Sequence, residues 1–431
     1  MGRQPFGLAS PAAFLGGAGH QVGVADLSVQ TVPSEAVRLA DMVAFHLPMH
    51  TATRMAAPMI AQVKALNPAA RVVCYGLYAP INAAYLRSLG ANAIVGGEFE
   101  AELVRLAGDP GYSPAEDASF ERLAFPVPDR SALAPLAQYA QIDMGGGERR
   151  VAGYTEASRG CKHLCRHCPV VPVYAGKFRI VPWAVVLADV RQQVAAGARH
   201  IAFGDPDFFN GPAHAMRIVE ALAREFPGVT YDATIKVEHL LRHRDLLSGL
   251  ARTGCVLVTT AVESLDDRVL GLLDKGHTRA DFIEAAGLCR AAGLALSPTF
   301  IPFTPWTTMD SYRELLITLG ELGLAASVAP IQLALRLLVT NGSLLLELDD
   351  IRACVTGWDP VALTHRWRHR DPSIDELSVR LLRIVDGAGK AGEGRAETFA
   401  RICQEADVAM PDLPVLASRA TVPFLTEPWY C

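Results

Sequence analysis

The chain has 431 residues, of which 50% are hydrophobic and 20% are charged, and its formal net charge is −5. A chain this long and this apolar fits two or three domains with large cores, and disorder is excluded as its overall state. The acidic balance argues against a dedicated nucleic-acid-binding protein, and no apolar run reaches the roughly 20 residues that a membrane helix needs. Because residues Met1–Phe6 also lack the apolar stretch of a secretory signal, we expect a cytoplasmic protein.

Residues 1–108 alternate between predicted strands and helices, which favours a Rossmann-like domain built on a parallel sheet. The predicted strands are Gln21–Leu27, Met42–Phe45, Arg71–Tyr75 and Ala93–Val95. The predicted helices are Ala9–Leu15, Pro33–Leu39, Thr51–Leu66, Ile81–Leu89 and Glu98–Ala107. A unit of this kind normally opens on a strand, whereas this chain opens on a loop and a helix. We therefore expect that the true start lies upstream or that the sheet lacks its first strand.

A linker rich in proline and glycine over residues 109–150 precedes a second series of alternating elements over residues 151–340. The predicted strands of this series are Gly153–Ala157, His200–Phe203, Thr230–Ile235, Val256–Ala261, Ala295–Phe300 and Ser327–Leu333. Six β/α units in succession favour a partial (β/α)6 barrel whose site lies at the carboxyl ends of the strands. The predicted fold class is therefore α/β, with residues 341–431 as a small C-terminal extension.

Three of the nine cysteines crowd together directly after the first barrel strand: Cys161, Cys165 and Cys168. An odd number of otherwise scattered cysteines argues against a disulfide framework. Three thiolates on one loop can hold three corners of a [4Fe–4S] cluster and leave its fourth iron open to bind a small molecule. Zinc, with His163 or His167 as a fourth ligand, is the alternative, and three unrelated buried cysteines are the least favoured interpretation.

The spacing C-x3-C-x2-C at the end of the first strand of a six-unit β/α domain resembles the radical SAM superfamily over Val151 to about Leu338. That resemblance implies a [4Fe–4S] cluster that binds S-adenosylmethionine (SAM) at its free iron and reductively splits a carbon–sulfur bond to give a carbon radical. It also implies that the three cysteines are catalytic. The family usually places an aromatic residue just before the third cysteine, and His167 takes that position here.

The same resemblance implies SAM-binding residues at the ends of the later strands. They are Gly204, Asp205 and Asp207 after the second strand, Lys236 after the third, Glu263 and Ser264 after the fourth, and Gln332 and Arg336 on the last. The acidic groups after the second strand would receive the amino group of SAM, and the later positions would meet its ribose, carboxylate or adenine.

Structural roles compete with these assignments. Asp207 and Ser264 could instead cap the helices that follow them. Lys236 could form an ion pair with Glu238. Arg336 lies in an apolar run and requires a carboxylate or phosphate partner if it is buried.

The two-domain arrangement resembles the cobalamin-binding radical SAM enzymes. Gly76–Tyr78 and Gly96–Glu98 fall where the loops of that N-terminal domain hold the corrin and its nucleotide tail. The D-x-H-x-x-G signature that supplies a histidine to cobalt does not occur in this sequence, although the radical SAM class often binds cobalamin without it. Cobalamin is thus a cofactor that the resemblance permits and does not require.

Several short runs resemble a narrower group, the radical SAM proteins with a C-terminal Cys-Cys-Ala-Glu-Pro tail, whose second position is selenocysteine in some members. These runs are Arg3–Pro11, Pro48–Arg54, Gly160–His163, Gly204–Asn210 and Thr426–Trp429. The group includes the enzyme of arsinothricin biosynthesis, so the resemblance implies transfer of a 3-amino-3-carboxypropyl group from SAM to trivalent arsenic.

Cys431 is the last residue of the chain and the first of that tail pattern. Because arsenic(III) is soft and thiophilic, Cys431 is a candidate arsenic ligand. We expect either that a UGA codon for selenocysteine after Cys431 is read as a stop, or that the chain ends naturally with one reactive cysteine.

Together these features predict a SAM-cleaving transferase that acts on a small-molecule substrate such as arsenite. It would take electrons from a reducing partner such as flavodoxin or ferredoxin, and neither nucleic acid nor a membrane is an expected partner. A cobalamin-dependent radical SAM methyltransferase is the alternative enzyme. A non-catalytic sensor that binds a cluster or zinc is the alternative of another class.

Overall fold

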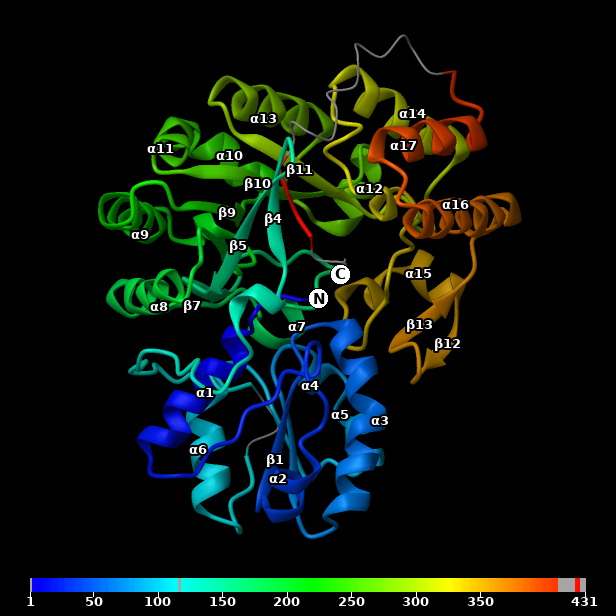
Figure 1. The fold of residues 1–431 in the computed structure, drawn as a ribbon. Helices are drawn as coiled ribbons and strands as arrows, with labels where there is room; N and C mark the ends of the chain where they lie inside the picture. The colour runs from blue at the N-terminus through cyan, green and yellow to red at the C-terminus, as the bar shows by residue number, and fades with distance from the viewer. Residues whose placement is uncertain (1, 115–117, 410–422, 427–431) are drawn as a thin grey trace.

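The computed structural model describes residues 2–114, 118–409 and 423–426, and these form two α/β bodies and a C-terminal extension (Figure 1). In Figure 1 the N-terminal body, in blue and cyan, lies below the second body. Cys431, the predicted arsenic ligand, lies outside the described residues, as does the rest of the tail after Thr426. Among the described helices, none combines the length and apolarity that a bilayer crossing requires.

The N-terminal body contains a three-stranded parallel sheet in the order β1 (Met42–His46), β2 (Arg71–Tyr75) and β3 (Ala93–Val95). Its helices are α1 (Phe6–Gly17), α2 (Ser34–Leu39), α3 (His50–Leu66), α4 (Tyr78–Ile81), α5 (Ala83–Ser88) and α6 (Glu100–Gly108). β2 and β3 are short apolar runs that are almost completely buried, as expected for parallel strands covered by helices. Parallel strands joined by helices confirm the predicted Rossmann-like alternation.

The predicted strand Gln21–Leu27 is wrong, because these residues form no strand. None of their side chains is fully buried, so the segment adds no strand face to the core. The segment runs instead into a turn in which the amides of Val29 and Gln30 donate to the carbonyl of Asp26.

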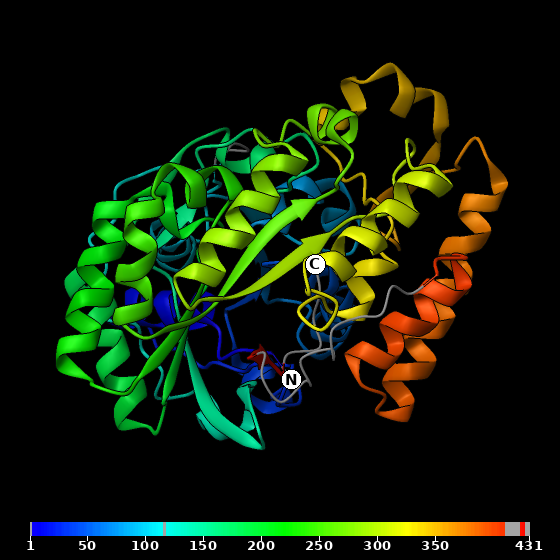
Figure 2. The same ribbon diagram turned by 90° about the horizontal axis from the view of Figure 1, so that it is seen from above.

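The second body is a curled sheet in the order β11-β10-β9-β8-β5-β4-β14, with helices along its outer face (Figure 2). Its parallel strands are β5 (Glu148–Thr155), β8 (His200–Phe203), β9 (Thr230–Thr234), β10 (Cys255–Glu263) and β11 (Ala295–Phe300). The helices between and after them are α8 (Trp183–Ala195), α9 (Pro212–Glu225), α10 (Val237–Arg242), α11 (Leu247–Arg252), α12 (Asp267–Leu273), α13 (Arg279–Ala291) and α14 (Met309–Glu321). This curled half-barrel confirms the predicted α/β fold class.

Two antiparallel strands extend the sheet beyond β5. They are β4 (Gln141–Gly145), which pairs with β5, and β14 (Phe424–Leu425), which pairs with β4. β4 lies within the predicted linker, so the end of that linker belongs to the barrel sheet. Its pairing with β14 also brings the last described residues of the chain beside residues near position 142.

The predicted sixth strand Ser327–Leu333 is wrong, because its second half is a short 3-10 helix over Pro330–Leu333. Pro330 has no amide hydrogen to donate to a strand ladder. The side-chain carbonyl of Gln332 accepts a hydrogen bond from the amide of Phe300 at the end of β11 (3.1 Å). One side chain thus supplies a contact that a sixth strand would have made through its backbone.

Within its described residues, the C-terminal extension adds a hairpin and three α-helices to the barrel. They are β12 (Val355–Asp359), β13 (Thr364–Trp367), α15 (Asp349–Cys354), α16 (Pro372–Ala391) and α17 (Arg395–Glu405). The apolar faces of α16 and α17 join the barrel core. The hairpin turn reaches the N-terminal body, where Nε2 of His50 lies 2.6 Å from the carbonyl oxygen of Ala362. The extension therefore contacts both bodies.

A buried ionic cluster joins the two bodies close to the cysteines. Arg159, in β6 (Ser158–Gly160), donates to the two carboxylate oxygens of Glu100 at 2.9 and 2.7 Å. The guanidinium also lies 2.8 Å from a carboxylate oxygen of Glu156 and 3.6 Å from one of Glu98. Burial raises the pKa of Glu98 to about 7. One guanidinium therefore neutralises carboxylates from both bodies, two residues before the first cysteine.

Candidate active site

The three cysteines lie on a loop between β6 and the short helix α7 (Val171–Tyr174). Asp205, predicted to bind SAM, holds the entry to this loop: it accepts hydrogen bonds from the amide of Ala157 (2.9 Å) and the hydroxyl of Ser158 (2.6 Å). Within the loop, the amide of Cys168 donates to the carbonyl of Cys165 (3.1 Å). Hydrogen bonds to Asp205 therefore hold the residues just before the loop, and a backbone turn from Cys165 to Cys168 makes its second half compact.

Two buried lysines surround the loop with positive charge. Sγ of Cys165 is buried and lies 3.8 Å from Nζ of Lys236. Lys275 is also buried, and its pKa is raised because the charges of Glu263 and of two cysteines outweigh the effect of burial. Both ammonium groups therefore lie where negative charge on the sulfurs would be stabilised.

The donor set fits a [4Fe–4S] cluster. Cys161, Cys165 and Cys168 are free thiols. Burial raises the pKa of Cys168 to about 12 and also raises the pKa of Cys161, so a bound metal must displace their protons. A cluster held by three thiolates carries net negative charge, which the two buried ammonium groups offset.

Glu263, predicted to contact SAM, and His167, at the position where the family has an aromatic residue, meet beside the loop. Oε1 of Glu263 lies 3.2 Å from Nε2 of His167 and 3.3 Å from Nζ of Lys275. Burial raises the pKa of this carboxyl, but Lys275 and His167 together lower it to about 2. Glu263 also has a left-handed backbone (φ 71°) at the end of β10. An ionised carboxylate is therefore fixed next to the residue that precedes the third cysteine.

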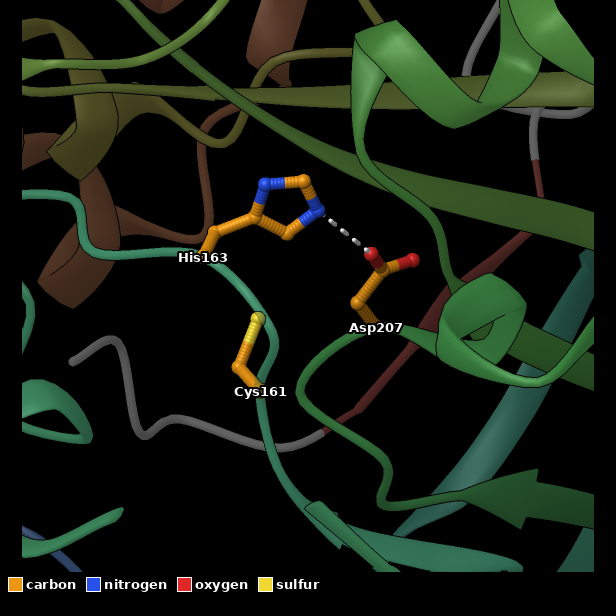
Figure 3. Close-up of side chains that lie close together, drawn as sticks. All are labelled: Cys161, His163 and Asp207. Carbon is orange, nitrogen blue, oxygen red and sulfur yellow. Dashed lines mark ion pairs between the residues drawn. The ribbon is translucent and has the colours of Figure 1, made fainter. Parts of the chain in front are cut away.

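A second cluster of polar groups lies beside Cys161 (Figure 3). Oδ2 of Asp207 lies 2.7 Å from Nδ1 of His239 and 3.7 Å from Nε2 of His163. Donor atoms of Cys161, His163 and Asp207 all lie within 4.8 Å of one another. This set contains His163 but only one of the three cysteines that the zinc interpretation requires. Asp207 also accepts a hydrogen bond from the amide of Phe209 (3.3 Å), so it has a capping contact as well.

The remaining predicted residues make contacts within the protein. The hydroxyl of Tyr154 fills the space beside Gly204, and Oγ of Ser264 accepts a hydrogen bond from the amide of Asp266 (3.1 Å). Arg336 has the carboxylate partner that its apolar surroundings require, because it pairs with Asp375. The structure therefore brings a subset of the predicted residues together at the loop: the three cysteines, His167, Asp207, Lys236 and Glu263.

Lys275 and Arg159 are two residues of the site region that the sequence reasoning does not predict. Lys275 follows α12 and contacts Glu263, which lies twelve residues earlier in the chain. A lysine and a histidine on either side of Gly276, directly after a helix, are the signal that could have indicated it. Arg159 has a comparable signal, because it is a charged residue in a short strand that leads into Cys161.

A pocket of about 360 Å³ lies next to Lys236, whose Nζ is 3.8 Å from a carboxylate oxygen of Glu238 in the pocket wall. Glu238 and His277 are among its lining residues. His277 is buried, and its pKa is lowered to about 4 by burial and by the charges of Lys275 and Lys236, so its imidazole is neutral at pH 7. The pocket is large enough to admit a small metabolite to this side of the site.

Methionine at Lys236 removes the buried charge beside Cys165 and keeps most of the side-chain volume. We expect the reduction potential of the reconstituted cluster to fall by tens of millivolts, because the ammonium group stabilises the charge added on reduction. A potentiometric titration followed by electron paramagnetic resonance measures the shift. Lys162→Met is the matched control, since Lys162 is exposed on the same loop and solvent screens its charge. An equal shift in both variants would contradict the assigned role.

Part of the chain matches a known protein family. Residues 155–318 match the family model of the radical SAM superfamily, which implies the predicted cofactors, a [4Fe–4S] cluster and SAM. The tRNA-2-methylthio-N(6)-dimethylallyladenosine synthase of Chloroflexus aurantiacus is 27% identical over 291 residues, which cover 61% of this chain and 54% of that protein. The enzyme of the same name from Chlorobium chlorochromatii is 29% identical over 150 residues, 33% of this chain and 32% of that protein. The matched region thus spans about half or less of the length of these relatives.

Solved structures share the fold over most of the chain. The cobalamin-dependent SAM radical enzyme OxsB, with aqua-cobalamin and SAM bound, has a TM-score of 0.72 at 14% identity and covers 90% of this chain and 65% of that chain. The radical SAM methyltransferase TsrM from Kitasatospora setae, with tryptophan substrate and a SAM analogue bound, has a TM-score of 0.57 at 17% identity and covers 74% and 68%. At these identities the likeness shows the fold alone. Residues 155–318, which contain the cysteine loop and most of the half-barrel, are a radical SAM superfamily domain.

Proposed function

We propose that this chain is an enzyme that reductively cleaves SAM at a [4Fe–4S] cluster held by Cys161, Cys165 and Cys168, and that it transfers a SAM-derived group to a small acceptor. The observation that carries this proposal is a loop of three free thiols, flanked by two buried lysines, within a radical SAM domain. When bound, such a cluster supplies the electron that breaks a carbon–sulfur bond of SAM.

The residues around the loop can bind and orient an amino acid moiety. The carboxylate of Glu263 is ionised and buried, so it can accept hydrogen bonds from an ammonium group. Lys236 and Lys275 are buried cations that can meet a carboxylate. His277 is neutral and can donate or accept one hydrogen bond without adding charge.

For the transferred group we propose 3-amino-3-carboxypropyl, and for the acceptor trivalent arsenic. The support is the resemblance of runs such as Arg3–Pro11 and Gly204–Asn210 to the group that contains the arsinothricin enzyme. One electron from a flavodoxin- or ferredoxin-type partner and cleavage of one carbon–sulfur bond release methylthioadenosine. The remaining carbon radical would add to As(OH)3, and a second electron from the same partner, with loss of hydroxide, would leave a trivalent product with a carbon–arsenic bond.

Methyl transfer is the second candidate. The fold likeness to OxsB and TsrM favours it, since TsrM is a radical SAM methyltransferase and OxsB is cobalamin-dependent. A methyltransferase of the cobalamin-dependent kind would yield S-adenosylhomocysteine and 5′-deoxyadenosine instead of methylthioadenosine.

The deciding experiment is anaerobic incubation of the reconstituted protein with SAM, dithionite, arsenite and hydroxocobalamin, followed by mass spectrometry. Methylthioadenosine together with a carbon–arsenic product supports the arsenic proposal. S-adenosylhomocysteine with 5′-deoxyadenosine overturns it in favour of methyl transfer. Iron-free protein, or SAM recovered intact, overturns SAM cleavage itself.

A further inference from the structure

The carboxyl ends of β1, β2 and β3 form the edge at which an open α/β sheet normally binds its ligand. The loops Gly76–Tyr78 and Gly96–Glu98, which the sequence places at the corrin in a cobalamin-binding domain, lie at this edge. Whether a corrin fits there depends on what already occupies the edge. In the part of the chain that the structure describes, three other segments contact this edge.

Helix α1 covers the ends of β1 and β2. The hydroxyl of Tyr75 donates to the carbonyl of Gly7 (2.8 Å), and a Cβ on Gly7 would lie 2.1 Å from the imidazole of His46. His46 packs against Tyr75 and Phe99, with ring centroids 5.2 and 6.0 Å away. Burial, with a smaller effect of Arg159, lowers the pKa of His46 to about 3. His46 is therefore a neutral residue packed among aromatic rings.

The segment around Ser119 covers the end of β3. The amide of Glu98 donates to the carbonyl of Ser119 (2.8 Å), and the amide of Ser119 donates to the carbonyl of Gly96 (3.1 Å). Gly97 has a left-handed backbone (φ 69°), and a Cβ there would lie 2.1 Å from the carbonyl oxygen of Ser119. Backbone hydrogen bonds at Gly96 and Glu98 therefore hold a segment that follows α6 against Gly96 and Gly97.

The cysteine loop and its flanks cover the rest of the edge. The hydroxyl of Tyr174 lies 3.4 Å from the carbonyl oxygen of Gly97 and 3.3 Å from Oε1 of Glu98. Val170 and Val173 join the apolar core of the N-terminal body, against which Cys161 and Cys168 also pack. The guanidinium of Arg159 stacks on the rings of Phe6, Phe99 and Phe125, with its central carbon 4.7–5.3 Å from the ring centroids.

We propose that this edge of the N-terminal sheet is a docking face for the chain's own cysteine loop and takes no corrin. A corrin and its nucleotide tail would have to displace three sets of contacts together. These are the backbone hydrogen bonds at Ser119, the packing of α1 against His46 and Tyr75, and the contacts of Tyr174. The inference rests on the proposed function and deepens it, because the transferred group would pass from SAM to the acceptor without cobalt as a carrier. The likeness to OxsB is then one of fold and not of cofactor content.

The first test is cofactor content, which does not depend on activity. The full chain is reconstituted anaerobically with iron, sulfide and an excess of hydroxocobalamin, desalted, and analysed for iron and cobalt by mass spectrometry, with OxsB treated in the same way as a positive control. We expect about four iron atoms per chain and less than about one cobalt per ten chains. Cobalt close to one per chain, with the visible spectrum of protein-bound cobalamin, overturns the proposal. Iron-free protein would instead count against the proposed function.

The second test measures, in cobalamin-free protein, whether Gly97 packs against the segment around Ser119. Gly97→Ala is expected to lower the melting temperature by at least about 3 °C, because alanine is strained at this φ and meets the Ser119 carbonyl. Gly19→Ala is the matched control, since Gly19 is exposed, has a left-handed backbone (φ 87°) as Gly97 does, and a Cβ there meets nothing within 4 Å. A loss in Gly97→Ala no larger than that in Gly19→Ala would show that the space beside Gly97 is open, which overturns the proposal.

Discussion

Serine at Cys161, Cys165 and Cys168 together is expected to abolish iron binding and to reduce SAM cleavage by at least about a thousand-fold. The reason is that hydroxyl groups are poor ligands for iron–sulfur clusters, while the loop keeps its shape through Asp205 and through the turn between Cys165 and Cys168. Iron analysis, the visible spectrum and detection of SAM-derived products measure the loss. The apo-protein should stay folded with a modestly lower melting temperature, because Cys161 and Cys168 pack against the apolar core of the N-terminal body, where serine places a hydroxyl.

The matched control for that experiment is Cys354→Ser. Cys354 is a partly buried free cysteine at the end of α15, outside the loop, and its Sγ lies 3.3 Å from the carbonyl oxygen of Ile351. Serine can keep this hydrogen bond, so iron content and SAM cleavage should match those of the unmodified chain. Full iron occupancy in the triple variant would contradict the assignment of the cluster to these three cysteines.

Methionine at Arg159 is expected to destabilise the fold by about 3–5 kcal/mol, as removal of one partner from a buried ion pair typically does. The substitution leaves Glu98, Glu100 and Glu156 without their shared cation, and the first two are buried almost completely. Urea unfolding at pH 7 measures the effect. Arg149→Met is the control, because Arg149 pairs with Asp143 at 3.2 Å while 62% exposed, and such a pair contributes at most about 1 kcal/mol.

The pH dependence of the Arg159→Met effect provides a separate check. Burial places the pKa of Glu98 at about 7, above the 4.5 of an unperturbed glutamate. A group whose pKa is higher in the folded state binds its proton more tightly there, so its contribution to stability is present at low pH and is lost as the pH rises towards 7. The loss of Arg159 raises this pKa further, so the variant should be closer in stability to the unmodified chain at pH 5 than at pH 8. A pH-independent difference would contradict the charge-based explanation.

Spacing and hydrophobic pattern were sufficient for the local features of this protein. Three cysteines within one short loop can reach a common metal cluster whatever surrounds them, so the sequence alone indicated the cluster. Apolar runs such as Arg71–Tyr75, His200–Phe203 and Ala295–Phe300 formed strands at the predicted residues, because buried parallel strands are continuous apolar segments. Alternation of such runs with helices was enough for the α/β class.

Only the tertiary structure decided which polar residues reach the cysteines and which serve the fold. Asp205 and Gln332 bond to backbone amides that lie 48 and 32 positions away, Arg336 pairs with Asp375, and Arg159 meets Glu100 from the other body. A strand likewise exists only where a partner lies beside it, so neither Gln21–Leu27 nor Ser327–Leu333 formed one. The physical reason is the same in each case. Burial and hydrogen-bond partners come from segments distant in sequence, which a local pattern does not encode.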